Sequence, residues 1–227
     1  MGIWYNFGRM LRPRWRKAAW LCQELTGSEA QALRAEEQYG ETLAPSLADR
    51  FPIDEAPSVK AFVRDIGEYL ASHLRKREYR FRFRPVCSPQ VNAFALPGGL
   101  VFVTRCLLEF CDWNQDEVAF VLAHEIAHVA CRHARDKLLT SAVASAWSPS
   151  ALSSAFVLSE YSKDSELEAD SFAVRLLRDS GFDKRGAIRF LRRLGERPTG
   201  GTDSDADLGL FSTHPPLEER LANVRKA

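Results

Sequence analysis

Residues 121–133 read VLAHEIAHVACRH and contain the pattern His-Glu-x-x-His at His124, Glu125 and His128. Because successive residues of an α-helix are rotated by about 100°, the two histidines lie about 40° apart on one face. Two imidazoles in this arrangement can hold one zinc ion, and Glu125 lies beside that face, within reach of a water at the metal. The pattern is short and arises by chance, however, and two histidines of a buried helix can equally be satisfied core residues.

The flanks of this stretch support a helix. Asn114 followed by Glu117 predicts a capping box at the helix start. Apolar residues recur at the spacing of a mostly buried helix, namely at Val118, Val121, Leu122, Ile126 and Val129. A metallopeptidase needs a third protein ligand and a fourth position open to water, so the rest of the chain has to supply one more ligand.

Composition predicts an ordinary globular chain. The sequence has 227 residues, 45% of them hydrophobic, which is enough for a substantial core. Its net charge of +1 gives no reason to expect a nucleic-acid partner. No stretch predicts a signal peptide or a transmembrane helix. The cysteines are odd in number and form no Cys-x-x-Cys pair, which favours free thiols in a reducing, cytoplasmic compartment over disulfides or a thiolate zinc site.

Two stretches stand apart from this pattern. Residues 1–20 combine aromatic side chains with five basic residues and no acid. They suit either a peripheral membrane anchor or a helix that packs on the domain through its tryptophans, and we favour the second interpretation. Residues 138–159 carry no charge but contain several serines and a proline, which favours a flap over a cleft or an interfacial segment over a membrane span.

The remaining chain predicts helices and a few strands. Helical patterns cover residues 28–47, 59–74, 107–111 and 162–180, and alternating aromatics at Tyr79, Phe81 and Phe83 predict a strand. Residues 91–104 predict a hairpin that turns at Pro97-Gly98-Gly99. The first strand of this hairpin looks small and exposed, so besides being a simple hairpin it could pair with an extended peptide.

A candidate for the third ligand lies in residues 162–180, which read SKDSELEADSFAVRLLRDS. Glu166 and Asp170 share one helix face, whereas Glu168 is rotated by about 200° from Glu166 and points away. An acidic run is usually a solvated face, but the apolar residues after Asp170 turn this segment into the core. A buried carboxylate needs a cation. Glu166 as a metal ligand, with Asp170 orienting a ligand histidine, meets that need.

Four stretches occur together and in a fixed order: NAFALPGG (92–99), HEIAHVACRH (124–133), ELEAD (166–170) and THPPLEER (213–220). In these stretches the chain resembles the HtpX/BepA-like zinc metalloendopeptidases of the CAAX prenyl protease type 1 family, which are gluzincins of metallopeptidase family forty-eight. The resemblance implies a zincin-like α+β fold that is mainly α, with a small antiparallel sheet beside the catalytic helices. We expect a peptidase domain over residues 28–227, and residues 1–27 form a basic, aromatic extension outside the resemblance.

The resemblance also implies a site. One zinc ion per chain is expected on His124, His128 and Glu166, with Glu125 as the catalytic base. The edge strand that holds the substrate is expected at Asn92, Ala93, Phe94 and Ala95. The membrane spans of the family are not found here, and the usual glycine after Thr104-Arg105 is Cys106.

Three further residues of these stretches leave alternatives open. His133 is rotated by about 140° from His128 on a continuous helix, so we interpret it as structural. His214 either lies at a helix start, behind a capping Thr213, or acts at the metal. In the second case it stabilises the oxyanion or occupies the open zinc position of a latent state. Arg220 either pairs with a buried carboxylate or lies at the surface.

The favoured function is a zinc-dependent endopeptidase that hydrolyses extended or unfolded polypeptides, with Glu125 activating the attacking water. One alternative is a chaperone-like or latent zinc protein that binds extended polypeptides with little turnover, and another is a structural zinc site. Glu125 counts against both alternatives, because neither needs a base beside the metal. The sequence does not indicate an oligomeric state.

Overall fold

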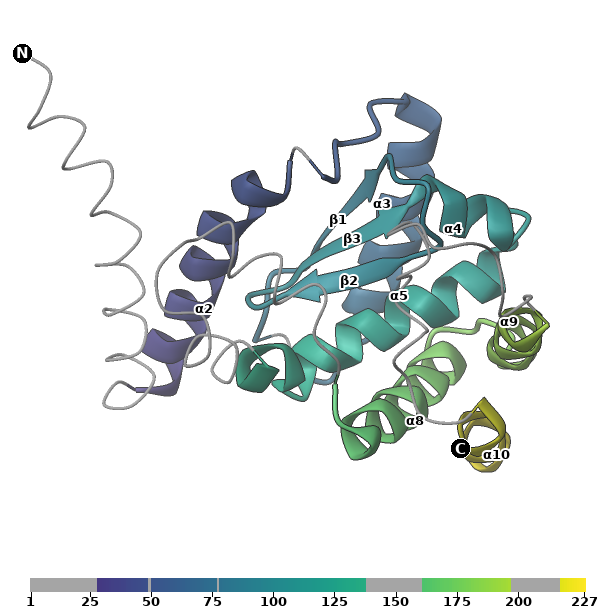
Figure 1. The fold of residues 1–227 in the computed structure, drawn as a ribbon. Helices are drawn as coiled ribbons and strands as arrows, with labels where there is room; N and C mark the ends of the chain where they lie inside the picture. The colour runs from purple at the N-terminus through teal and green to yellow at the C-terminus, as the bar shows by residue number, and fades with distance from the viewer. Residues whose placement is uncertain (1–27, 49, 77, 138–160, 197–216) are drawn as a thin grey trace, which may run out of the picture.

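The computed structural model describes residues 28–48, 50–76, 78–137, 161–196 and 217–227 (Figure 1). Its helices are α2 (Glu29–Leu43), the 3-10 helix η1 (Ala44–Leu47), α3 (Pro57–Ser72), α4 (Arg105–Phe110), α5 (Gln115–Ala130), α8 (Lys163–Asp179), α9 (Arg185–Gly195) and α10 (Leu217–Lys226). Its strands are β1 (Arg82–Val86), β2 (Ala93–Leu96) and β3 (Leu100–Thr104). The described part is therefore mainly helical with one small sheet, as the α+β prediction requires.

The predicted hairpin is confirmed. β2 and β3 pair antiparallel, and Gly98 and Gly99 of the turn have φ angles of 84° and 93°. Such positive φ angles favour glycine. Gly98 is constrained twice, because a Cβ on it would lie 2.3 Å from the Cα of Glu37 in α2. The turn residues thus set the hairpin and also let it approach α2 closely.

The sheet as a whole is mixed rather than antiparallel. Its strand order is β1-β3-β2, and β1 runs parallel to β3. The antiparallel expectation therefore holds for β2 with β3 and is wrong for β1. Alternating aromatics indicate which face of a strand is buried, but no local turn fixes the partner of β1 or its direction. The strand also begins later than predicted, at Arg82, so Tyr79 and Phe81 precede it and pack against the core from outside.

Helix α5 occupies the centre of the fold, between the sheet and α8 (Figure 1). It begins as predicted, since Asn114 Oδ1 accepts a hydrogen bond of 3.2 Å from the backbone N–H of Glu117. The carboxylate of Glu117 does not complete a capping box but pairs instead with Arg189 and Arg193 of α9, at 3.3 and 3.5 Å. Every residue from 117 to 129 is buried, so the histidine pattern lies inside the molecule.

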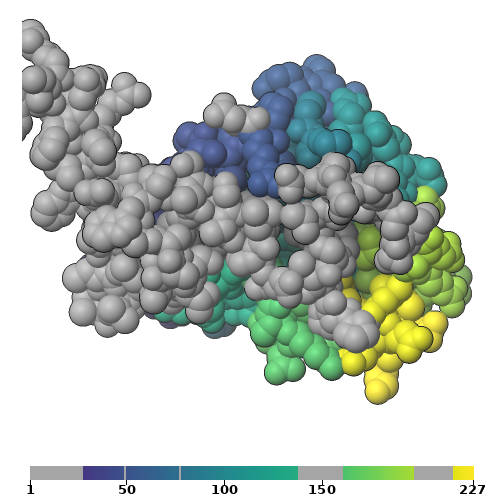
Figure 2. Space-filling model, viewed as in Figure 1, coloured from purple at the N-terminus to yellow at the C-terminus, as the bar shows by residue number. Residues whose placement is uncertain are grey.

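Helix α10 closes one end of the molecule against α8 (Figure 2). Asn223 donates a hydrogen bond of 2.7 Å to the carbonyl of Leu167, and Ser171 donates one of 3.1 Å to Asn223. These bonds fix α10 beside the acidic segment of α8. Within the described ranges, no helix is both long enough and apolar enough to cross a bilayer.

Several predictions concern residues outside the described ranges. These are the extension at residues 1–27, the uncharged segment 138–159, and the Thr213 cap with His214. The boundary between residues 27 and 28 also stays a prediction. Ser28 precedes α2, and its backbone N–H donates a hydrogen bond of 2.8 Å to Gln31.

Candidate metal centre

Two helices bring three potential metal ligands together. α5 carries His124 and His128, and α8 carries Glu166. The Nε2 atoms of the two histidines are 3.0 Å apart, and the Glu166 oxygens lie 3.3 Å from His124 Nε2 and 3.4 Å from His128 Nε2. Two donors bound to one tetrahedral zinc at 2.0–2.1 Å are themselves about 3.3 Å apart. The donor set and its spacing therefore fit a single zinc ion.

Asp170 and Arg220 support this cluster from behind. Asp170 Oδ1 lies 3.0 Å from His124 Nδ1, and Arg220 donates hydrogen bonds of 2.7 and 2.6 Å to the same carboxylate. Burial alone would raise the pKa of Asp170, but Arg220 and His124 outweigh it and hold the pKa below its usual range. Asp170 is thus an ionised carboxylate. It favours the His124 tautomer with the proton on Nδ1, which leaves Nε2 free to bind a metal.

The two histidines differ in their electrostatic surroundings. Burial acts to lower the pKa of His124, but Asp170 and Glu166 raise it to about 9. Burial lowers the pKa of His128 to about 3. Because a metal ion binds neutral imidazole, zinc would have to displace the proton that the carboxylates favour on His124.

Glu125 lies beside the three ligands, and no ion pair joins it to a basic side chain in the described part of the chain. It is 2% exposed, and its Oε2 atom has no hydrogen-bond partner among the described residues. Burial, with the nearby charge of Glu166, raises its pKa to about 7, although His124 and a hydrogen bond from the Ala95 backbone lower it. A carboxylate with a pKa near neutrality is suited to accept a proton and pass it on.

Strand β2, the predicted substrate strand, is at the edge of the sheet and next to Glu125, but its side chains are not exposed. The exposed fractions of its predicted substrate residues are 3% for Asn92, 0% for Ala93, 4% for Phe94 and 1% for Ala95. The expectation of an exposed strand is therefore wrong. Ala93 and Ala95 pack in the cluster that contains α5, whereas Phe94 packs with α2, so both faces of the strand are covered. Among the described residues, β2 lies at one edge of the sheet, so its backbone edge is the part that can pair with a peptide.

Two residues near the centre, Tyr161 and His133, have positions that the sequence did not predict. The ring of Tyr161 stacks on that of His128, with centroids 3.7 Å apart and planes at 11°. His133 Nδ1 lies 3.2 Å from His128 Nδ1, and its Nε2 lies 3.4 Å from Glu168 Oε2. The prediction that His133 points away from His128 assumed that the helix continues to residue 133. In fact α5 ends at Ala130, and Arg132 has a φ of 63°, which turns the chain back towards His128.

A second group of potential ligands consists of Cys131, His133 and Glu168, whose donor atoms lie within 4.8 Å of one another. Burial, and to a lesser extent the charge of Glu168, raises the pKa of Cys131 to about 11. The Cys131 thiol is therefore protonated near neutral pH. The first group is the better candidate, because its three residues are all buried, whereas the second includes an exposed Glu168 and a Cys131 that keeps its proton. His214, the other predicted catalytic residue, lies outside the described residues.

The chain matches a known family and several proteins within it. Residues 55–227 match the model described as Peptidase family M48. Over 213 aligned residues, the chain is 28% identical to the beta-barrel assembly-enhancing protease of Escherichia coli strain K12, covering 84% of this chain and 43% of that protein.

Two other relatives are similar over shorter stretches. The metalloprotease YcaL of the same organism is 32% identical over 160 residues, which cover 63% of this chain and 60% of YcaL. The mitochondrial metalloendopeptidase OMA1 of Schizosaccharomyces pombe is 32% identical over 162 residues, covering 66% of this chain and 47% of that protein. The chain thus spans about half the length of these relatives.

Proposed function

We propose that this chain, which belongs to peptidase family M48, is a zinc-dependent endopeptidase that acts on extended or unfolded polypeptides. The observation that carries the proposal is the meeting of His124, His128 and Glu166 at donor spacings of 3.0–3.4 Å, beside a buried Glu125. The three relatives described above are each named as a protease or peptidase, which supports a peptide-bond hydrolase.

In this proposal His124, His128 and Glu166 hold one zinc ion per chain. Bound zinc would supply a Lewis acid that acidifies water and polarises the scissile carbonyl. Glu125 accepts the proton of the attacking water and delivers it to the leaving nitrogen. Its pKa of about 7 places both protonation states within reach near neutral pH. Asp170, fixed by Arg220, orients His124 during these steps.

The polypeptide substrate pairs with the backbone edge of β2 at residues 92–95. Extended peptides bind sheet edges through main-chain hydrogen bonds, which are independent of sequence. Because the side chains of β2 are buried, we expect this strand to contribute little side-chain selectivity. His214 remains a predicted oxyanion donor or occupant of the open zinc position.

A latent zinc protein is the second candidate, and the burial of the site favours it. His124, Glu125 and Glu166 are 3%, 2% and 0% exposed, and Glu125 is hydrogen bonded to the very strand that a substrate would pair with. In that state the centre would bind zinc but would turn over slowly until a substrate or partner opened it.

The cellular compartment of the chain and its contact with membranes are also part of the proposal. The described cysteines are free thiols, which supports a reducing compartment such as the cytoplasm. Membrane contact through residues 1–20 stays a proposal. Comparing liposome binding of the full chain with that of a chain lacking these residues would test it.

Replacing Glu125 by Gln tests the proposed enzyme. We expect Glu125→Gln to bind one zinc per chain and to lose casein hydrolysis by about 10²–10⁴-fold, because it removes the proton acceptor but no ligand. Zinc is measured by elemental analysis, and hydrolysis with and without a chelator. Chelator-sensitive hydrolysis at the unchanged rate in Glu125→Gln would reject the role of Glu125. Zinc binding without hydrolysis in the unaltered chain would favour the latent protein.

A further inference from the structure

His133 lies behind the metal ligand His128. The Nε2 atom of His128 faces His124 and Glu166, whereas its Nδ1 atom is 3.2 Å from His133 Nδ1. Both rings are buried, at 1% and 9% exposure. The two imidazoles are therefore close enough for one hydrogen bond on the side of His128 that faces away from the cluster.

Proton positions along this contact follow from the ligand role of His128. A ring nitrogen that binds a metal carries no proton, so neutral His128 carries its proton on Nδ1 and donates it to His133 Nδ1. His133 must then carry its own proton on Nε2. That atom lies 3.4 Å from Glu168 Oε2, which accepts. Each ring nitrogen thus has one role, and the hydrogen bonds run in one direction, from His128 to His133 and from His133 to Glu168.

The other metal histidine has an equivalent but shorter arrangement. His124 Nδ1 lies 3.0 Å from the buried Asp170, with no residue between them. Glu168 is more exposed than Asp170, since its side chain retains 61% of its accessible surface. A hydrogen bond from the Cys131 thiol gives Glu168 a second contact. His128 is therefore linked to a carboxylate only through His133, and the exposed Glu168 is the weaker of the two residues in this link.

We infer that His133 is a positioning residue of the zinc site, which fixes the ring orientation and tautomer of His128 and is itself held by Glu168. The inference rests on the proposed zinc site and adds an outer support to it. Losing such an outer partner typically lowers metal affinity by about 10–100-fold.

Zinc affinity of single variants of the full chain tests this inference. We expect His133→Ala to raise the zinc dissociation constant by about 10–100-fold. His133→Asn should retain most of the affinity, because the amide oxygen of Asn can take the place of the accepting Nδ1 atom. Glu168→Ala should raise the zinc dissociation constant by less than about tenfold, because the Glu168 side chain is largely exposed. Asp164→Asn, an exposed acid of the same helix, is the matched control and should change nothing.

Three measurements separate positioning from a structural role. Zinc affinity is measured by competition with a chromophoric chelator, and the visible spectrum of the cobalt-loaded protein reports ligand geometry. Unfolding of the metal-free variants by urea gives the structural effect alone. Wild-type zinc affinity in His133→Ala would overturn the inference, and so would equal losses in the Ala and Asn variants that match their loss of metal-free stability. Neither result depends on turnover, so failure of the endopeptidase proposal is distinguishable.

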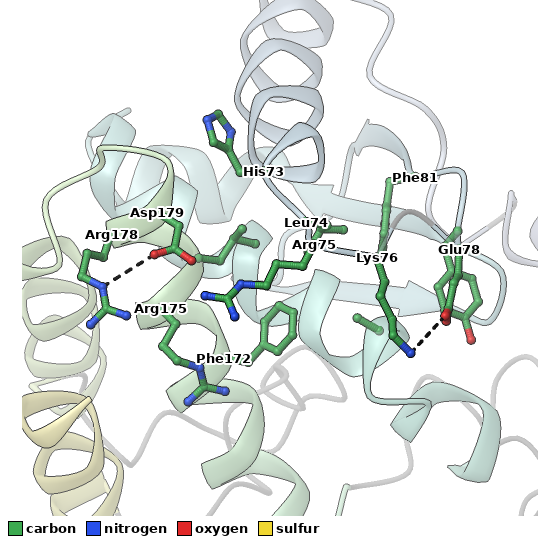
Figure 3. Close-up of a pocket in the computed structure, with 13 residues that line it drawn as sticks. His73, Leu74, Arg75, Lys76, Glu78, Phe81, Phe172, Arg175, Arg178 and Asp179 are labelled. Carbon is green, nitrogen blue, oxygen red and sulfur yellow. Dashed lines mark ion pairs between the residues drawn. The ribbon is translucent and has the colours of Figure 1, made fainter.

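A pocket of about 420 Å³ lies between α8 and the end of α3 (Figure 3). Its volume lies within the range of small-molecule sites. It is bounded by the end of α3, the segment that follows it, and one face of α8. The apolar part of its lining consists of Leu74, Tyr79, Phe81, Ala130, Phe172 and Leu176.

The charges around this pocket are unbalanced. Lys76 pairs with Glu78 at 3.5 Å, and Arg178 pairs with Asp179 at 3.7 Å. Arg75 and Arg175, by contrast, have no carboxylate partner in the described part of the chain. Figure 3 shows both side chains extending towards Phe172, and the Arg175 guanidinium carbon lies 5.9 Å from the centre of that ring.

We propose that this pocket binds a single-chain amphiphile with an anionic head group. The planar guanidinium groups of Arg75 and Arg175 suit a carboxylate or a phosphate, and the apolar lining suits an alkyl chain. Octyl phosphate and octanoate represent the two heads, octyltrimethylammonium carries the same chain with a positive charge, and inorganic phosphate carries no chain.

Calorimetric titration of the full, zinc-loaded chain tests this proposal. We expect saturable binding of at least one of the two anionic octyl compounds, at one per chain. We also expect at least tenfold weaker binding to the double variant Arg75→Gln/Arg175→Gln. Arg64→Gln, an exposed arginine of α3 paired with Asp65, should bind as the unaltered chain does. Equal binding of the cation, unchanged binding to the double variant, or absence of saturable binding would each overturn the proposal.

Discussion

Asp170 serves two buried partners at once. It accepts two hydrogen bonds from Arg220 and lies against His124, and all three side chains are almost inaccessible to water. Removing its charge leaves the buried Arg220 guanidinium, among the described residues, with only the longer contact of 4.0 Å to Glu166, and breaking such a buried pair typically costs about 3–5 kcal/mol.

We therefore expect Asp170→Asn to lower the free energy of unfolding of the metal-free chain by about 3–5 kcal/mol, and to weaken zinc binding as well. Urea unfolding with and without zinc measures both effects. Asp65→Asn is the control, because Asp65 also pairs with an arginine, at 2.7 Å, but on the exposed surface of α3. Similar stability of the two variants would contradict a structural role for the Asp170–Arg220 pair.

At the residue scale, the sequence identified the cluster wherever side chains follow regular helix geometry. The spacing of His124 and His128, and of Glu166 and Asp170, holds inside unbroken helices, so their common faces were predictable. His133 was not, because the backbone leaves the helix before it, at the positive φ of Arg132. Tyr161 gave no signal, since its position depends on packing against a distant helix. The catalytic and ligand roles themselves stay predictions.

The hairpin turn is the element whose sequence signal was strongest, and it gives a direct test of the close approach to α2. Gly98 and Gly181 both have positive φ, at 84° and 79°, but only Gly98 has a close neighbour where a Cβ would lie. Changing glycine to alanine at positive φ costs about 1 kcal/mol or more through backbone strain. The clash with Glu37 adds to this cost at Gly98.

We thus expect Gly98→Ala to destabilise the protein clearly more than Gly181→Ala, by at least about 1 kcal/mol of additional unfolding free energy. Thermal unfolding of both variants measures the difference. Equal losses would mean that the turn does not pack against α2 as described.

At the element scale, the sequence predicted the helices and strands that form through contacts between residues near one another in the chain. Caps and apolar periodicity gave α2, α3, α5 and α8, and the Pro-Gly-Gly turn gave β2 and β3. The direction of β1 depends on pairing with a strand that follows later in the chain, and no turn records it. The burial of β2 was missed for a related reason, because its covering residues belong to α5 on one side and α2 on the other.

Across the whole molecule, Asp54 connects segments that are far apart in sequence. Arg105, at the start of α4, donates to it at 2.6 Å, and the backbone N–H of Ala56 donates at 3.0 Å. The hydrogen bond from Arg105 is the largest influence that lowers the pKa of Asp54 below its usual value. A group with a lowered folded-state pKa adds stability above its unfolded pKa, and this stability is lost as the pH falls through the folded value.

We expect Asp54→Asn to be less stable than the unaltered chain at pH 7, by about 1 kcal/mol, because the Arg105 side chain is 37% exposed and partly screened. The difference should shrink as the pH falls below about 3.9, the ordinary pKa of the unfolded carboxyl. Urea unfolding across this range measures it. A difference that is constant with pH would show that the ionised Asp54 is not its source.

We propose that two imidazoles of α5 and one carboxylate of α8 bind a single zinc ion where the two helices meet. X-ray absorption at the zinc edge of the loaded full chain tests it most directly. We predict a first shell of nitrogen and oxygen atoms only, at about 2.0–2.1 Å, with two imidazoles. A sulfur atom at about 2.3 Å, as Cys131 would give, or failure of the chain to bind zinc, would contradict the account.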